Sequence, residues 1–228
     1  MPDSTSQTAA TAVPYAFPLD EFYARSGLAL PKLERLAGDQ VPEPYRSLLV
    51  HENDMTPTLE KFHGADIHLE ILNRDRRAEA YFREVVLRLN GSETPVEFGA
   101  NKISLLLFPA RARQLILEER LPLGRILRDC EVTHTTRAKA FFKVDADALI
   151  GGVLGVAVGT VLYGRRATIF DPQQRPLSEI VEILPPAVIL AACFPPDVPP
   201  GFLRLIFSPI AHINLSSFST LQIQDRRQ

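Results

Sequence analysis

Several features that would place this sequence in a familiar class are missing. Its two cysteines, Cys130 and Cys193, are far apart and form neither a disulfide framework nor a metal-ligand pair, which fits a reducing compartment. The five histidines have no HxxxH or HExxH spacing, so we expect no metal site and no cofactor. The net charge of −2 gives no basic field of the kind that binds nucleic acid.

Membrane and export signals are also missing. The least polar segment, residues 148–163, is shorter than the ~20 residues of a membrane helix, so we expect no membrane span. The first 13 residues are small and polar and do not resemble a signal peptide. We therefore expect a cytoplasmic protein.

The composition is that of a globular protein with a full core. Of 228 residues, 46% are hydrophobic and 23% charged. We expect a flexible N-terminal arm over residues 1–20, one domain over residues 21–186, and a proline-rich C-terminal extension over residues 187–228 that packs on the domain. The oligomeric state is left open.

Alternating apolar residues predict three consecutive strands over residues 65–73, 81–89 and 95–108. Their links, one of them the Asn90–Gly91 turn, are too short for crossover helices, so the strands form an antiparallel meander. Further strands and several helices are expected, in this order: a helix at 57–63, a helix at 109–120, a helix ending at 129, strands at 130–144, 160–171 and 177–184. The fold class is α+β, an antiparallel sheet flanked by helices.

The strand over residues 81–89 carries an arginine on an otherwise apolar face. Because side chains alternate, Arg83 shares its face with Tyr81, Val85, Leu87 and Leu89. A buried arginine is costly unless an anion meets it. Two explanations stay open: an internal ion pair or edge position, and a pocket in which the planar guanidinium binds a ligand carboxylate.

A second charged residue lies inside an apolar strand. Glu182 shares a face with Ile180 and Leu184. If it met only Arg83, the two would form a structural ion pair. With a pocket between them, a carboxyl group with a raised pKa could act as a proton donor.

Four segments together resemble the chorismate pyruvate-lyase family, in its longer chorismate lyase-like branch. They are His51 to Thr56, Tyr81 to Leu87, Pro122 to Arg125, and Tyr163 to Arg166 followed by Glu182 and Pro185. The resemblance implies an antiparallel sheet with helices on one side and flaps over a closed pocket. It also implies cofactor-independent cleavage of chorismate to 4-hydroxybenzoate and pyruvate, within aromatic acid biosynthesis toward ubiquinone or plastoquinone.

The resemblance also assigns roles to individual residues. Arg83 would bind the ring carboxylate, together with the backbone at Met55 and Leu123, and Glu182 would assist departure of the enolpyruvyl group. The family's second arginine is missing, and Lys102, on the face of Val96, Phe98 and Ala100, would supply a second cation. Glu182 is also one residue further from the preceding turn than in the enterobacterial enzyme, which calls for a bulge or a longer turn.

Three functions remain open at this point. The main one is the chorismate lyase, an enzyme with a small aromatic acid as substrate. The alternatives are a lyase-like enzyme on a related enolpyruvyl or aromatic acid, and a non-catalytic protein that binds a small aromatic acid. An enzyme needs Arg83 and Glu182 in one cavity, whereas a binding protein needs only the cation.

Overall fold

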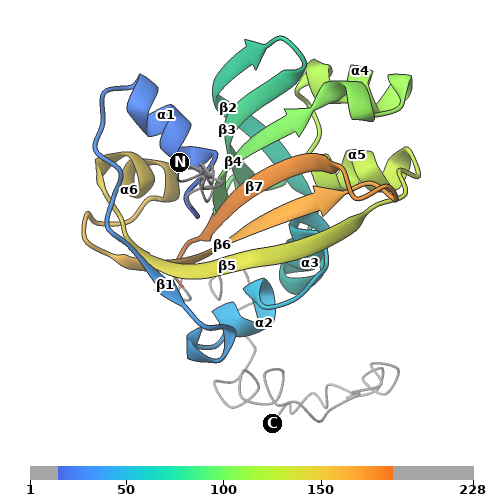
Figure 1. The fold of residues 1–228 in the computed structure, drawn as a ribbon. Helices are drawn as coiled ribbons and strands as arrows, with labels where there is room; N and C mark the ends of the chain where they lie inside the picture. Colours follow the sequence, from blue (N-terminus) through green and yellow to red (C-terminus); the bar gives the residue numbers. More distant parts are fainter. Residues whose placement is uncertain (1–14, 187–228) are drawn as a thin grey trace, which may run out of the picture. The chain divides into compact units, whose positions relative to one another are not determined.

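Seven antiparallel strands form one sheet in a computed structural model that describes residues 15–186 (Figure 1). The strand order is β1-β5-β6-β7-β4-β3-β2. The strands are β1 (Leu33–Leu36), β2 (Ile67–Arg77), β3 (Ala80–Leu89), β4 (Pro95–Ser104), β5 (Thr135–Asp145), β6 (Val161–Phe170) and β7 (Pro176–Leu184). The predicted α+β class and the β2–β3–β4 meander are confirmed.

Within residues 15–186, six α-helices accompany the sheet. They are α1 (Leu19–Arg25), α2 (Tyr45–Leu49), α3 (Met55–His63), α4 (Ala110–Glu118), α5 (Leu123–Asp129) and α6 (Ala148–Leu154), with 3-10 turns at Gly38–Gln40 and Leu105–Leu107. Helix α3 ends as predicted at Gly64, which adopts a left-handed conformation with φ of 62°. It begins at Met55, two residues before the predicted start at residue 57, because Asp54 is the last extended residue.

Helices cover both faces of the sheet, so the expectation of helices on one side is wrong. One face packs against α1 and α6 through the aromatic residues Phe82, Phe98 and Phe142. The other face packs against α2 to α5 through aliphatic residues of β2, β3 and β7. Figure 1 shows α1 and α6 on one side of β4 and β7, and α4 and α5 on the other. Burial on both faces explains why these strands are apolar on both sides.

The predicted N-terminal arm is too long. Ala16 and Leu19 are 3% and 0% exposed, and α1 starts at Leu19. The short apolar cluster that precedes residue 21 is therefore part of the core and anchors α1 on the sheet. Residues 1–14 of the predicted arm, and the C-terminal extension, lie outside the described residues.

The apolar segment after β5 folds into the buried helix α6, which leads into β6. Asp147 accepts a hydrogen bond from the backbone N–H of Ile150 and caps α6. A side chain at Gly151 would lie 2.8 Å from the carbonyl oxygen of Val156, so close packing requires glycine there. Among residues 15–186, no helix is long and apolar enough to cross a membrane.

Candidate functional site

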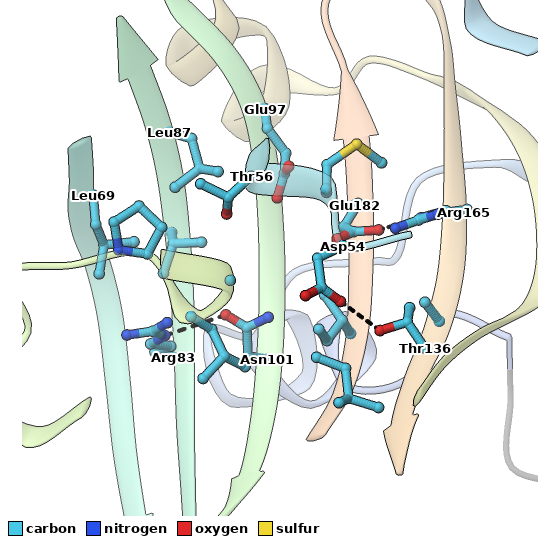
Figure 2. Close-up of a pocket in the computed structure, with 18 residues that line it drawn as sticks. Asp54, Thr56, Leu69, Arg83, Leu87, Glu97, Asn101, Thr136, Arg165 and Glu182 are labelled. Atoms are coloured by element: carbon cyan, nitrogen blue, oxygen red, sulfur yellow. Dashed lines mark hydrogen bonds and ion pairs between the residues drawn. The ribbon is translucent and has the colours of Figure 1, made fainter. Parts of the chain in front are cut away.

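A cavity of about 40 Å³ lies between the sheet and the N-terminal ends of α3 and α5 (Figure 2). Asp54, Met55 and Thr56 cover it from α3, and Pro122, Leu123 and Gly124 cover it from α5. The remaining lining residues come from the strands: Leu69, Arg83, Val85, Leu87, Glu97, Asn101, Thr136, Arg165, Ala167, Ile169, Ile180 and Glu182. Apolar walls with a few converging polar groups are typical of small-molecule sites.

Four of the five predicted site residues meet in this cavity. Arg83, Glu182, Met55 and Leu123 all line it, although they come from four separate elements. A register shift in the β6–β7 hairpin, next to Phe170, supplies the predicted bulge and keeps Glu182 on the cavity side. The chemical roles of these residues stay predictions.

The placement of Lys102 is wrong. Lys102 lies on the opposite face of β4, where its Nζ pairs with Glu179 Oε2 at 3.1 Å. Its neighbour Asn101 lines the cavity instead, directly across from Arg83 in the β3–β4 register. The alternation of the strand was identified correctly, but the face that turns toward the cavity is the one with Glu97, Gly99 and Asn101.

Arg83 is the unusual group of the site. Its side chain is among the largest that are fully buried, and its Nε donates a 3.2 Å hydrogen bond to Asn101 Oδ1. Its Nη1 has no hydrogen-bond partner, and no described carboxylate forms an ion pair with it. Glu119, the acidic group that influences it, already binds Arg74 and Tyr81.

Burial lowers the pKa of Arg83 to about 10, with small opposing contributions from Tyr81 and Glu119. The guanidinium therefore keeps its charge at neutral pH. A buried charge without a counter-ion is unfavourable. The site thus presents a preformed cation whose free N–H groups lack an acceptor.

Glu182 has a partner already. Arg165 Nε donates to Glu182 Oε2 at 2.5 Å, and both side chains are almost fully buried. Arg165 also donates to the backbone carbonyl oxygens of His51 and Asn53, at 3.1 and 3.0 Å. It therefore ties the segment before α3 to the sheet. Its neighbour Arg166 faces away from the cavity and pairs with Glu179.

Glu97 is a site residue that the sequence analysis missed. It lines the cavity from β4, is 5% exposed, and its Oε2 has no hydrogen-bond partner. Burial and the nearby Glu182 raise the pKa of Glu97 well above its usual range, and Arg165 opposes this. One signal was available in the sequence. Glu97 and Asn101 lie two residues before and two residues after Gly99, so both are on the same face of a buried strand.

Three polar groups close the cavity on its outer side. Asp54 accepts hydrogen bonds from Thr136 Oγ1 at 2.5 Å and from His134 Nε2 at 2.9 Å. Its burial would raise the pKa of Asp54, but these bonds outweigh it and the pKa is lowered; the same bond raises the pKa of His134. Asp54 and Thr136 also line a larger groove outside, so they separate the cavity from solvent at this point.

Comparison with known proteins gives similarity of structure but not of sequence. The sequence matches no protein-family profile, and no curated protein sequence is significantly similar to it. Among solved structures, PhnF from Mycobacterium smegmatis aligns with 12% identity over 76% of this chain and 95% of its own, at a TM-score of 0.49. The effector domain of PhnF aligns with 12% identity over 61% of this chain and 92% of its own, at a TM-score of 0.47.

A third solved structure is also similar at low sequence identity. It is the ligand-binding domain of a protein from Bordetella bronchiseptica that is assigned to the GntR family of transcriptional regulators. It aligns with 18% identity over 51% of this chain and 83% of its own, at a TM-score of 0.40. At such low identities and TM-scores, these similarities establish neither a family nor a function for this chain.

Proposed function

We propose that the protein binds a small aromatic carboxylic acid in the cavity, with the carboxylate on Arg83. One observation carries this proposal: Arg83 is a fully buried cation with a free N–H edge and no described counter-ion. A ligand carboxylate would replace the missing counter-ion and accept charge-assisted hydrogen bonds from the planar guanidinium.

The rest of the cavity suits a ring. Leu87 and Val85 from β3, with Ile169 and Ile180 from β6 and β7, offer apolar walls. The N-terminal ends of α3 and α5 add backbone N–H groups that have no acceptor within their helices. The chorismate lyase-like resemblance of the sequence assigns the same side chain, Arg83, to the ring carboxylate.

Binding requires movement. A cavity of about 40 Å³ holds a few water molecules, at ~10–15 Å³ for each, and not a substituted ring. The cover formed by α3 and α5 must therefore shift outward before the ligand enters. Because Gly124 has no side chain, the ends of α3 and α5 can return to close contact after the ligand has entered. A Cβ at this position would lie 3.1 Å from the side chain of Thr56.

Isothermal titration calorimetry with 4-hydroxybenzoate tests the proposal. The wild-type protein should bind the acid, and Arg83→Met should lose about 2–5 kcal/mol of binding free energy, the range for truncation of a buried charged partner. That corresponds to at least about thirtyfold weaker binding. The matched control is Arg88→Met, on the same strand, whose arginine pairs with Glu70 near the surface and should leave affinity unchanged. Equal binding by both variants, or none by the wild type, would contradict the proposal.

A second candidate function is the chorismate lyase reaction. Arg83 and Glu182 line one cavity, which is the arrangement an enzyme of this type needs. Against Glu182 as proton donor stands its ion pair with Arg165, which makes it a hydrogen-bond acceptor. Incubation with chorismate, with pyruvate and the aromatic product followed by chromatography against a no-enzyme control, tests this candidate. Absence of pyruvate would eliminate it and leave the binding function standing.

A further inference from the structure

The cavity has a second polar end, away from Arg83. In the β3–β4 register, Arg83 lies opposite Asn101 and Leu87 lies opposite Glu97. Four residues of strand separate the two ends, or about 13 Å at ~3.3 Å per residue. Figure 2 shows Arg83 and Asn101 at one end and Glu97 apart from them. Because the side chains of Arg83 and Glu97 both extend into the cavity, the space left between them is about the length of one substituted ring.

The charges at that end favour a neutral Glu97. Glu182 lies on the neighbouring strand β7, on the same face, and its carboxylate takes the nearest cation, Arg165. A second ionised carboxylate there would have no counter-ion of its own. Burial and Glu182 accordingly hold the pKa of Glu97 far above its usual range.

A neutral carboxyl group carries an O–H that needs an acceptor. The structure gives Glu97 Oε2 no partner among the described residues. A side chain is excluded at Gly99, because its Cβ would lie 2.7 Å from the carbonyl oxygen of Val181 and 3.3 Å from Glu97 Oε1, so no side chain there crowds the carboxyl group. An unsatisfied donor inside a ligand cavity is therefore left for the ligand.

We propose that Glu97 determines the specificity of the site, as a hydrogen-bond donor to a hydroxyl or ether oxygen on the ligand at the end away from Arg83. The inference rests on the proposed function and narrows its ligand to a monoanionic acid with one such oxygen. A second ionised carboxylate in the ligand would lie near the ionised Glu182, whose cation Arg165 is already used, and the cation once expected there, Lys102, lies on the other face of the sheet. We therefore expect dicarboxylates, chorismate among them, to bind more weakly than monoanionic acids.

Three commercially available acids of nearly equal shape test this. They are 4-hydroxybenzoate, benzoate, and benzene-1,4-dicarboxylate. In the wild type, 4-hydroxybenzoate should bind about tenfold more tightly than benzoate, because benzoate leaves a buried polar group unpaired. The dicarboxylate should bind more weakly than benzoate.

Two variants of Glu97 distinguish the effect of its hydrogen-bond donor from the effect of its side-chain volume. Glu97→Gln keeps a neutral donor and should keep the preference for 4-hydroxybenzoate. Glu97→Met fills similar space without a donor, so it should bind 4-hydroxybenzoate and benzoate with equal affinity. Thermal unfolding of each variant verifies that it is folded.

The outcomes distinguish the two proposals. If both acids bind equally well to the wild type and Arg83→Met abolishes both, the role of Glu97 is wrong and the proposed function stands. An unchanged preference in Glu97→Met, or tightest binding of the dicarboxylate, would likewise overturn the role of Glu97. If neither acid binds the wild type, the proposed function fails first.

Discussion

Replacement of Arg83 by methionine should stabilise the ligand-free protein and strongly weaken its binding of the ligand. Burial lowers the pKa of Arg83 from its ordinary value to about 10, which corresponds, at ~1.36 kcal/mol per pH unit, to a penalty of about 3 kcal/mol on the charged form in the fold. The sign follows from linkage: a cation whose pKa is lowered by folding destabilises the fold at every pH below the lowered value, hence at neutral pH. Methionine occupies similar volume and carries no charge.

The expected gain is smaller than this penalty. Loss of Arg83 leaves Asn101 Oδ1 without its donor, which costs about 1–3 kcal/mol at a buried site and least where cavity water can replace the donor. We expect a net gain of about 1–2 kcal/mol. For a chain of this size, that raises Tm by roughly 2–8 °C.

Thermal unfolding with and without 4-hydroxybenzoate measures both effects. A ligand at one hundred times its wild-type Kd stabilises the wild type by about 2.7 kcal/mol, and because Arg83→Met binds at least about thirtyfold more weakly, the same concentration should stabilise the variant by less than about 1 kcal/mol. The order of stability should therefore reverse: the variant is the more stable protein without ligand and the less stable with it. Arg88→Met, which removes a surface ion pair, should respond to ligand as the wild type does. A ligand-free Arg83→Met that melts several degrees below the wild type would refute the argument, because the arginine would then be satisfied in the fold.

Three further changes test the framework of the site. Arg165→Met should destabilise the protein by about 3–5 kcal/mol in urea unfolding, because it strands a buried carboxylate, and an unchanged midpoint would contradict the buried ion pair. The hydrogen bond to Asp54 raises the pKa of His134 in the folded protein. Protonated His134 therefore stabilises the fold fully below about pH 6.5, the pKa of an unfolded histidine, and this stabilisation is lost as the pH rises through the folded pKa. The difference in unfolding free energy between wild type and His134→Gln should accordingly be larger at pH 5.5 than at pH 9, and a constant difference would argue against the bond. Gly164→Ala should cost about 1–3 kcal/mol, because its Cβ would lie 2.5 Å from a backbone carbonyl oxygen of β7, whereas Gly152→Ala in α6, with open space around it, should not destabilise.

Much of the fold could be predicted because local rules decide it. Short links between strands leave antiparallel pairing as the sole option, and Gly64 ends α3 where a left-handed residue is needed. The boundary of α1 could not be predicted in the same way. Its apolar residues, Leu19, Phe22 and Tyr23, have helical spacing, but the helix is only seven residues long and is not stable by itself. It forms because the sheet face beneath these residues is apolar and buries them.

The candidate site was predicted in part, for a related reason. An arginine or a glutamate inside an apolar strand is conspicuous in the sequence because burial of a charge is costly, so Arg83 and Glu182 could be found without a structure. The polar residues on β4 gave a weaker signal, because Glu97 and Asn101 share one face but Lys102 lies on the other. Alternation shows which residues share a face and not which face a cavity will occupy.

The sequence by itself thus determined the strands, their antiparallel order in the meander, and the presence of two unusual buried charges. Only the tertiary structure decided which charges meet. It turned Asn101 and Glu97 into the cavity and Lys102 out of it, and it joined Glu182 to Arg165 rather than to Arg83. The reason is that these contacts join strands that are distant in the chain, and their geometry depends on which helices cover each face of the sheet.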